Sequence, residues 1–120
     1  MSISISGVAA LAIDCADPAA LSAFWQNLLG GTVVIDDSGD AELHPHSGVV
    51  RIDFLRVPEA KTVKNRLHLD LRSRNYESAI AEAVHFGATL ADDIYDGGKW
   101  QVLRDPEGNE FCILRPRSTA

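Results

Sequence analysis

His68 and Asp70 are the residue pair with the clearest chemical potential, and they stand two positions apart in the alternating segment 67–71. Side chains alternate between the two faces of an extended strand, so we expect this imidazole and this carboxylate on one face and the three leucines on the helix-packed face. An imidazole titrates near neutral pH, and His68 can therefore act as a general base, as a hydrogen-bond partner for a ligand oxygen or as a metal ligand. The alternative is a polar wall residue that is hydrogen-bonded to Asp70 or to a neighbouring strand.

Two further reactive groups, Glu110 and Cys112, occupy alternate positions of the segment 110–114. A thiolate at position 112 would be a nucleophile or a metal ligand. A thiol with apolar neighbours on both sides is, alternatively, typical of an inert and buried cysteine. The only other cysteine, Cys15, lies in another apolar segment, and the two form no CxxC zinc motif, so we expect two reduced thiols.

Trp100 opens a predicted strand that also holds Val102, and it follows the short glycine-containing segment 97–99, with Tyr95 nearby. An aromatic side chain at such a position can lie over the mouth of a cavity and contact a ligand. Five cations near the middle of the chain can attract an anionic ligand or, alternatively, form a solvated patch that balances the acidic first half. These cations are Lys61, Lys64, Arg66, Arg72 and Arg74.

The first half of the chain predicts one helix between extended segments. Asp17-Pro18 is typical of a helix start, because the carboxylate accepts a free backbone amide and the fixed φ of proline suits the first turn. Apolar residues then recur with helical spacing from Leu21 onward, and Gly30-Gly31 ends the pattern. Strands are predicted at residues 7–15, 32–35, 41–44 and 49–57.

The second half repeats this order of elements. A helix is predicted between Asn75 and Gly87, with strands at residues 67–71, 89–91, 100–104 and 110–114. Two pairs of residues match at an offset of 56, Asp14 with Asp70 and Gly31 with Gly87, and Pro58 matches Pro116 at an offset of 58. Such agreement indicates an internal duplication. We therefore predict an α+β fold, a single domain over residues 1–120 made of two βαβββ modules at about 7–58 and about 63–116.

The composition limits the classes of partner. The chain has 120 residues, of which 46% are hydrophobic and 23% charged, and this permits one compact domain and excludes intrinsic disorder. A net charge of −6 argues against nucleic acid, because binding to phosphates relies on cations. The longest apolar run, residues 8–13, is far shorter than the ~20 residues that span a bilayer, and no basic leader begins the chain. We expect a cytoplasmic protein with neither a membrane nor a nucleic-acid partner.

Three blocks of sequence resemble the vicinal oxygen chelate superfamily, which comprises glyoxalases, bleomycin resistance proteins and extradiol dioxygenases. The blocks are LAIDCADPAALSAFWQNLLG at 11–30, VPEAKTVKNRLHLDL at 57–71 and VLRDPEGNEFCIL at 102–114. They occur in the family's order, and the match is closest to the glyoxalase-like branch. The resemblance implies a strongly curved sheet in each module, the two sheets arranged around a cavity, and a homodimer.

The resemblance also implies where a metal would bind, since metal-dependent relatives take ligands from the first and last strands of each module. His68 lies where the second-module histidine is found, and its first-module counterpart falls on Ala10 or Ala12. The usual glutamate position falls on Cys112, which the offset of 58 maps onto Phe54. A catalytic divalent ion needs at least three protein donors. We therefore predict no cofactor and no metal; the one remaining route to a metal site is His68 with Cys112, assisted by Asp70 or Glu110.

The sequence thus predicts a metal-independent, homodimeric glyoxalase-like protein that binds or sequesters a small, partly apolar organic metabolite or drug. The ligand-binding residues predicted are Phe54, His68, Asp70, Trp100, Val102 and Cys112. The first alternative is a lyase or isomerase of the same superfamily that uses His68 as a catalytic base or as a metal ligand. The second is a structural or regulatory protein whose cavity is filled by its own side chains.

Overall fold

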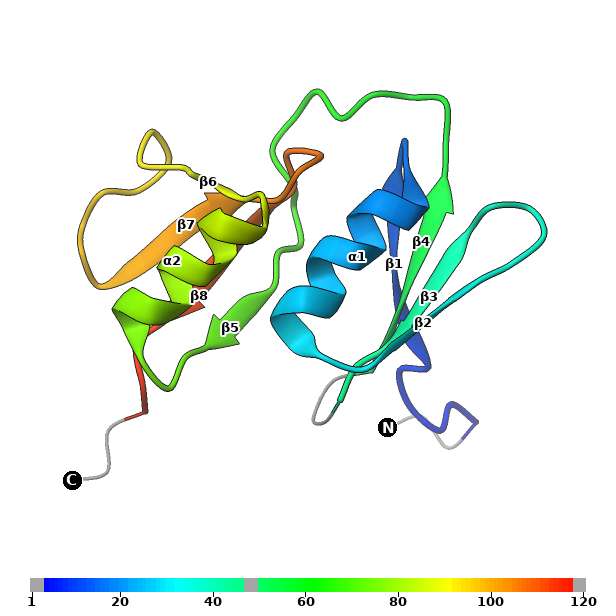
Figure 1. Ribbon diagram of the computed structural model, residues 1–120, viewed down its shortest axis with the longest axis horizontal. Helices are drawn as coiled ribbons and strands as arrows, with labels where there is room; N and C mark the ends of the chain where they lie inside the picture. Colours follow the sequence, from blue (N-terminus) through cyan, green and yellow to red (C-terminus); the bar gives the residue numbers. More distant parts are fainter. Residues whose placement is uncertain (1–3, 47–49, 118–120) are drawn as a thin grey trace. The chain divides into compact units, whose positions relative to one another are not determined.

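The chain divides into two compact units, Met1–Ala60 and Lys61–Ala120. The computed structural model describes residues 4–46 and 50–117 of the chain. Each unit contains one helix and four strands in the order βαβββ (Figure 1). The predicted α+β class and the repeated order of elements are therefore confirmed.

The elements of the first unit are β1 (Ala10–Cys15), α1 (Pro18–Leu29), β2 (Thr32–Ile35), β3 (Ala41–His44) and β4 (Arg51–Arg56). Those of the second unit are β5 (Asp70–Arg72), α2 (Tyr76–Phe86), β6 (Thr89–Leu90), β7 (Trp100–Arg104) and β8 (Glu110–Leu114). Each unit has its own mixed sheet, with the strand order β1-β4-β3-β2 in the first and β5-β8-β7-β6 in the second. In both sheets the first and last strands of the unit pair in parallel, and the other neighbours pair antiparallel.

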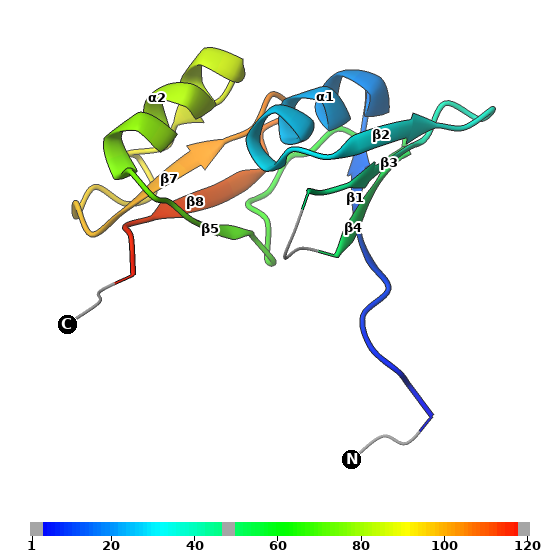
Figure 2. The same cartoon turned by 60° about the horizontal axis from the view of Figure 1, so that its bottom comes forward.

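Each helix begins with the side-chain cap that the sequence predicts. The Asp17 carboxylate accepts a hydrogen bond of 3.1 Å from the backbone N–H of Ala20, and the Asn75 side chain accepts one of 3.0 Å from Ser78. Both interactions satisfy an N–H group that has no partner within its helix. Figure 2 shows that α1 and α2 each lie on one side of the sheet of their own unit.

Alternate residues of the strands fill the core beneath each helix. In β4, Ile52 and Phe54 are completely buried. In β8, Phe111 and Ile113 are at most 2% exposed, and α2 packs against this strand. Since side chains alternate across a strand, Glu110 and Cys112 lie on the face of the second sheet opposite to α2. That face carries the site described below.

The first strand of the second unit is shorter than predicted and begins later. The sequence indicated a strand at 67–71, but β5 covers Asp70–Arg72, and the side chain of Leu67 is 74% exposed instead of packed against the helix. The reason is a competing contact, because the Glu110 carboxylate accepts a 2.8 Å hydrogen bond from the backbone N–H of Asn65. This contact draws the preceding segment to the start of β8. Pairing resumes only at Leu69, whose carbonyl accepts from the N–H of Cys112 at 2.9 Å.

Three other strands also differ from the prediction, and one of them, β6, ends at Leu90 instead of at residue 91. β1 begins at Ala10 instead of at residue 7, and Val8 is 68% exposed. β4 begins at Arg51; residue 49, where the prediction placed its start, lies outside the described residues. Within residues 4–46 and 50–117, neither helix has the length and apolarity that crossing a lipid bilayer requires.

Candidate ligand pocket

The second unit contains a pocket of about 300 Å³. It combines apolar and aromatic wall residues with a few polar groups, which is the usual composition of a site for a small organic molecule. The lining residues are Lys64, His68, Ile94, Tyr95, Trp100, Val102, Glu110 and Cys112.

The register of the second sheet brings the residues of the pocket floor together. Cys112 of β8 lies opposite Asp70 of β5 on one side and opposite Val102 of β7 on the other. Cys112 and Val102 are 7% and 5% exposed, and they pack with the fully buried Ala91. The floor of the pocket is therefore apolar, apart from the thiol itself.

Tyr95 and Trp100 form an aromatic wall. Their rings are stacked, with centroids 4.1 Å apart and an angle of 9° between the ring planes. Trp100 remains 37% exposed, so part of its indole surface is free for contact with a ligand. Gly97 allows this arrangement, because a Cβ atom at position 97 would overlap the phenol ring of Tyr95. Stacking of this kind contributes about 0.5–1.5 kcal/mol beyond the burial of area.

His68, Asp70 and Cys112 form a compact polar group at one side of the pocket. The Nδ1 atom of His68 lies 3.5 Å from an oxygen of Asp70, and potential ligand atoms of the three residues all lie within 4.8 Å of one another. Burial raises the pKa of the Cys112 thiol to about 11, and the Asp70 carboxylate adds to this effect through its negative charge and a hydrogen bond, while the charge of Lys64 opposes it. The thiol is therefore protonated at neutral pH and is a poor nucleophile.

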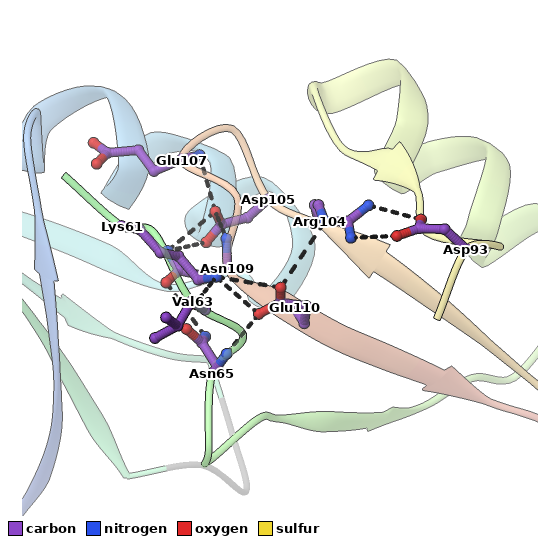
Figure 3. Close-up of polar contacts among 9 residues, drawn as sticks. All are labelled: Lys61, Val63, Asn65, Asp93, Arg104, Asp105, Glu107, Asn109 and Glu110. Carbon is purple, nitrogen blue, oxygen red and sulfur yellow. Dashed lines mark hydrogen bonds and ion pairs between the residues drawn. The ribbon is translucent and has the colours of Figure 1, made fainter. Parts of the chain in front are cut away.

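Glu110 lines the pocket but is already committed to other residues of the second unit, as Figure 3 shows. Its carboxylate lies 3.1 Å from the ammonium of Lys61 and accepts the N–H of Asn65 at 2.8 Å, and its side chain is only 6% exposed. Burial by itself raises the pKa of Glu110, but these two partners outweigh it, so the pKa lies below its usual range. Glu110 therefore fixes the segment that carries Lys64 against the start of β8.

The turn between β7 and β8 supports this contact. Asp105 is 3% exposed, and one of its carboxylate oxygens accepts hydrogen bonds from the backbone N–H groups of Glu107 and Asn109 at 2.9 and 3.0 Å (Figure 3). The side chain of Asn109 in turn accepts a hydrogen bond of 3.3 Å from the side-chain amide of Asn65. The residues of this turn thus act as a second anchor for the segment before β5.

Four of the predicted site residues line the pocket, namely His68, Trp100, Val102 and Cys112. Asp70 adjoins it through its contacts with the histidine and the thiol. The pocket also contains residues that sequence reasoning did not assign to the site. Ile94 belongs to an irregular segment with no periodic pattern, so no signal identified it, whereas Lys64 was visible only as one of five clustered cations.

The structure corrects the prediction for Phe54. This side chain is completely buried in the first unit, on the same face of β4 as Ile52, so it is a core residue and not part of the pocket. Asp14 pairs with Leu55 in the first sheet just as Asp70 pairs with Cys112 in the second. The counterpart of Cys112 is therefore Leu55. The offset of 58 between the two units, which the match of Pro58 with Pro116 indicated, is one residue too large at this strand. An error of one residue exchanges the two faces of a strand.

The same register identifies the other counterparts in the first unit. Ala12 corresponds to His68, and its partner in β4 is Asp53. The Asp53 carboxylate lies 2.9 Å from the guanidinium of Arg51, so its charge is already neutralised. These positions of the first unit therefore provide no histidine and no free carboxylate as ligands. The positions are Ala12, Asp53 and Leu55.

Solved structures with this fold include several proteins of related description. A glyoxalase/bleomycin resistance protein/dioxygenase family enzyme from Burkholderia phytofirmans PsJN is similar with a TM-score of 0.71 and 23% identity, over 91% of this chain and 98% of that one. TnmS3, an antibiotic binding protein from Streptomyces sp. CB03234, gives a TM-score of 0.68 and 18% identity, over 97% and 100% of the two chains. The fosfomycin resistance protein FosX from Listeria monocytogenes gives a TM-score of 0.67 and 13% identity, over 94% of this chain and 93% of that one.

No curated protein matches the sequence. The family model described as a glyoxalase-like domain, however, matches residues 10–114. The repeated βαβββ units agree with that match, and so does the fold shared with the solved structures. The chain therefore belongs to the glyoxalase-like domain family.

Proposed function

We propose that the pocket of the second unit binds and sequesters a small, partly apolar organic molecule without the help of a metal ion. The observation that carries this proposal is the combination of an apolar floor with a stacked aromatic wall in a pocket of about 300 Å³. Pockets of about this size and character suit small ligands. The antibiotic-binding description of TnmS3 supports a binding role for this fold.

The donor set supports metal independence. His68, Asp70 and Cys112 lie close enough to share an ion, but burial and the charge of Asp70 keep the Cys112 thiol protonated at neutral pH. A cation bound by this sulfur would have to displace the proton. Glu110 is held by Lys61 and Asn65 and is not available as a further ligand. Apart from this thiol, the group supplies only one imidazole and one carboxylate, fewer nitrogen and oxygen ligands than the three-residue His and carboxylate sites of catalytic metals.

A lyase or isomerase with His68 as its base is the second candidate. The contact of 3.5 Å between His68 and Asp70 favours it, because a carboxylate beside an imidazole orients the ring of a catalytic base. The two candidates differ in one measurable respect. An enzyme of this kind loses turnover when His68 is replaced by alanine, whereas a binding protein has no turnover to lose.

We further propose that the protein is a homodimer. Two large apolar side chains close to the pocket in sequence, Val63 and Leu67, are 75% and 74% exposed, and a second copy could cover such residues. The expected mass in solution at micromolar concentration is twice 13.0 kDa. A mass of 13.0 kDa in light scattering after size-exclusion chromatography would contradict this part of the proposal.

The binding proposal is tested by titration with N-phenyl-naphthylamine, an uncharged aromatic probe that fluoresces in apolar surroundings. We expect saturable binding to the wild-type protein and about tenfold weaker binding to the Trp100→Ala variant, because loss of the aromatic wall removes the largest contact area. Val84→Ala is the matched control, since Val84 is also exposed but lies on α2 outside the pocket. Equal affinity of the wild-type protein and Trp100→Ala would refute the proposed site.

A further inference from the structure

The acidic residues at the pocket have partners, whereas one of its cations has no acidic partner in the part of the chain that the structure describes. Both acids of the site have partners, because Glu110 is held by Lys61 and Asp70 contacts His68 and the Cys112 thiol. Lys64 also lines the pocket, but its ammonium has no acidic partner among residues 4–46 and 50–117. Lys64 is therefore the charged group of the pocket that is left available to a ligand.

The other cations of the basic segment are not candidates for this role. Lys61 binds Glu110 and also donates a 2.6 Å hydrogen bond to the carbonyl of Val63. Arg72 donates a 2.8 Å hydrogen bond to the carbonyl of Arg115. The remaining two, Arg66 and Arg74, are exposed and do not line the pocket. The structure thus selects one cation from the five that the sequence grouped together.

The position of Lys64 is fixed by its neighbours along the chain. The contacts of Lys61 and Asn65 with Glu110 hold the segment on both sides of Lys64 against the start of β8 (Figure 3). The charge of Lys64 reaches the pocket floor, where it acts on the Cys112 thiol. An anionic group inside the pocket would therefore lie near a cation that is carried by an anchored segment of the chain.

The wall provided by Tyr95 and Trp100 adds a requirement of shape. The two rings are nearly parallel, and the exposed part of the indole offers a flat apolar surface. A planar ring system placed against this surface extends the stack, whereas a branched aliphatic molecule makes less contact with it. A positively charged ring would gain from the aromatic surface but would be repelled by Lys64.

From the juxtaposition of this cation with the stacked aromatic pair, we infer that the pocket selects a planar aromatic molecule that carries a carboxylate. The ring stacks on Tyr95 and Trp100, and the carboxylate binds the ammonium of Lys64. This inference rests on the proposed binding function and adds the chemical class of its ligand. The charge-assisted hydrogen bond is the source of the selectivity, because a neutral molecule of the same shape lacks it.

The experiment compares three probes with the same ring, measured by calorimetric titration at low ionic strength. They are 2-naphthoate, the neutral 2-naphthamide and the cationic 2-naphthylmethylammonium. We expect the wild-type protein to bind naphthoate about tenfold more tightly than naphthamide, and the cation most weakly. The preference is expected to disappear in Lys64→Met and to return in Lys64→Arg, which restores the charge.

Arg66→Met is the control, because it removes one positive charge from the same segment but from a residue outside the pocket. It is expected to keep the preference for naphthoate. Equal binding of naphthoate and naphthamide, tighter binding of the cation, or a preference that survives in Lys64→Met would overturn the inference and leave the binding function standing. Absence of binding for all three probes would refute the binding function and the inference together.

Discussion

Cys112 lies directly opposite Asp70 across the parallel pairing of β8 with β5, and its Sγ atom is within 4.8 Å of a carboxylate oxygen of Asp70. This contact joins the two strands at the floor of the pocket and also determines the chemistry of the cysteine. Burial raises the pKa of this thiol most, and the negative charge of Asp70 acts in the same direction, so the thiol keeps its proton. The pocket is thereby suited to holding a molecule and poorly suited to nucleophilic attack on one.

The first prediction concerns the reactivity of this thiol. Because the pKa of Cys112 is about 11, alkylation by iodoacetamide is expected to be slow at neutral pH and to accelerate as the pH approaches that value. Asp70→Asn removes the negative charge, so the pKa falls and alkylation at neutral pH becomes faster. Peptide mass spectrometry follows Cys112 and Cys15 separately, and the buried Cys15 serves as an internal reference. Rapid alkylation of wild-type Cys112 at neutral pH would contradict this account.

The second prediction concerns the anchoring role of Glu110. In Glu110→Gln the ion pair with Lys61 is lost, and we expect the free energy of unfolding to fall by about 1–3 kcal/mol. Hydrogen exchange at the Asn65 amide is expected to become faster, because its acceptor loses its charge. Glu82→Gln on α2 is the control and is expected to leave both quantities unchanged.

The pH dependence of this contribution follows from the direction of the pKa shift. The pKa of Glu110 is lowered in the folded protein from its ordinary value of 4.5, so folding favours the ionised carboxylate. The stabilisation is therefore complete above pH 4.5 and is lost as the pH falls through the folded-state pKa. Urea unfolding of the wild-type protein and of Glu110→Gln at pH values above and below 4.5 measures the difference in their free energies of unfolding. A difference that increases as the pH falls would contradict this prediction.

The third prediction follows from the corrected position of Phe54. Since this ring is completely buried in the first unit, Phe54→Ala is expected to cost about 3–5 kcal/mol of stability. The milder Phe54→Leu keeps most of the apolar volume, and its affinity for N-phenyl-naphthylamine is expected to equal that of the wild-type protein. Substantially weaker binding by a folded Phe54→Leu protein would return this residue to the ligand site.

The fourth prediction concerns the aromatic wall. In Gly97→Ala the added methyl group overlaps Tyr95, so the stacking of Tyr95 with Trp100 is expected to be disturbed and the affinity for N-phenyl-naphthylamine to decrease. Near-ultraviolet circular dichroism reports the change in the stacked rings. Gly98→Ala is the control, because the added atom there meets no neighbour, although the positive φ of 79° makes the substitution strained. A larger loss of affinity in Gly98→Ala than in Gly97→Ala would contradict the role of Tyr95.

Local signals in the sequence were sufficient to predict most of the fold. The caps at Asp17 and Asn75 and the glycines after each helix act over a few residues, and they placed both helices correctly. The start of β5 could not be predicted in this way, because it depends on a contact between Asn65 and Glu110, which are 45 positions apart. Alternation alone continued the strand back to residue 67.

The candidate site was predictable only where strand parity determined it. Val102 and Cys112 lie on strands and His68 lies two residues before β5, and all three line the pocket. The choice of Phe54 over Leu55 failed because sequence matching cannot define register to a single residue when few identities remain. The selection of Lys64 from its neighbours required side-chain contacts that no spacing rule contains.

Binding of N-phenyl-naphthylamine with and without a divalent ion tests the central claim most directly. The wild-type protein is treated with EDTA, and the titration is repeated after addition of Mn²⁺, Ni²⁺ or Zn²⁺ and in the His68→Ala variant. The account predicts tight binding to the metal-free protein, with an affinity that none of the three ions changes. Binding that is absent after EDTA treatment, restored by one of these ions and lost again in His68→Ala would contradict it.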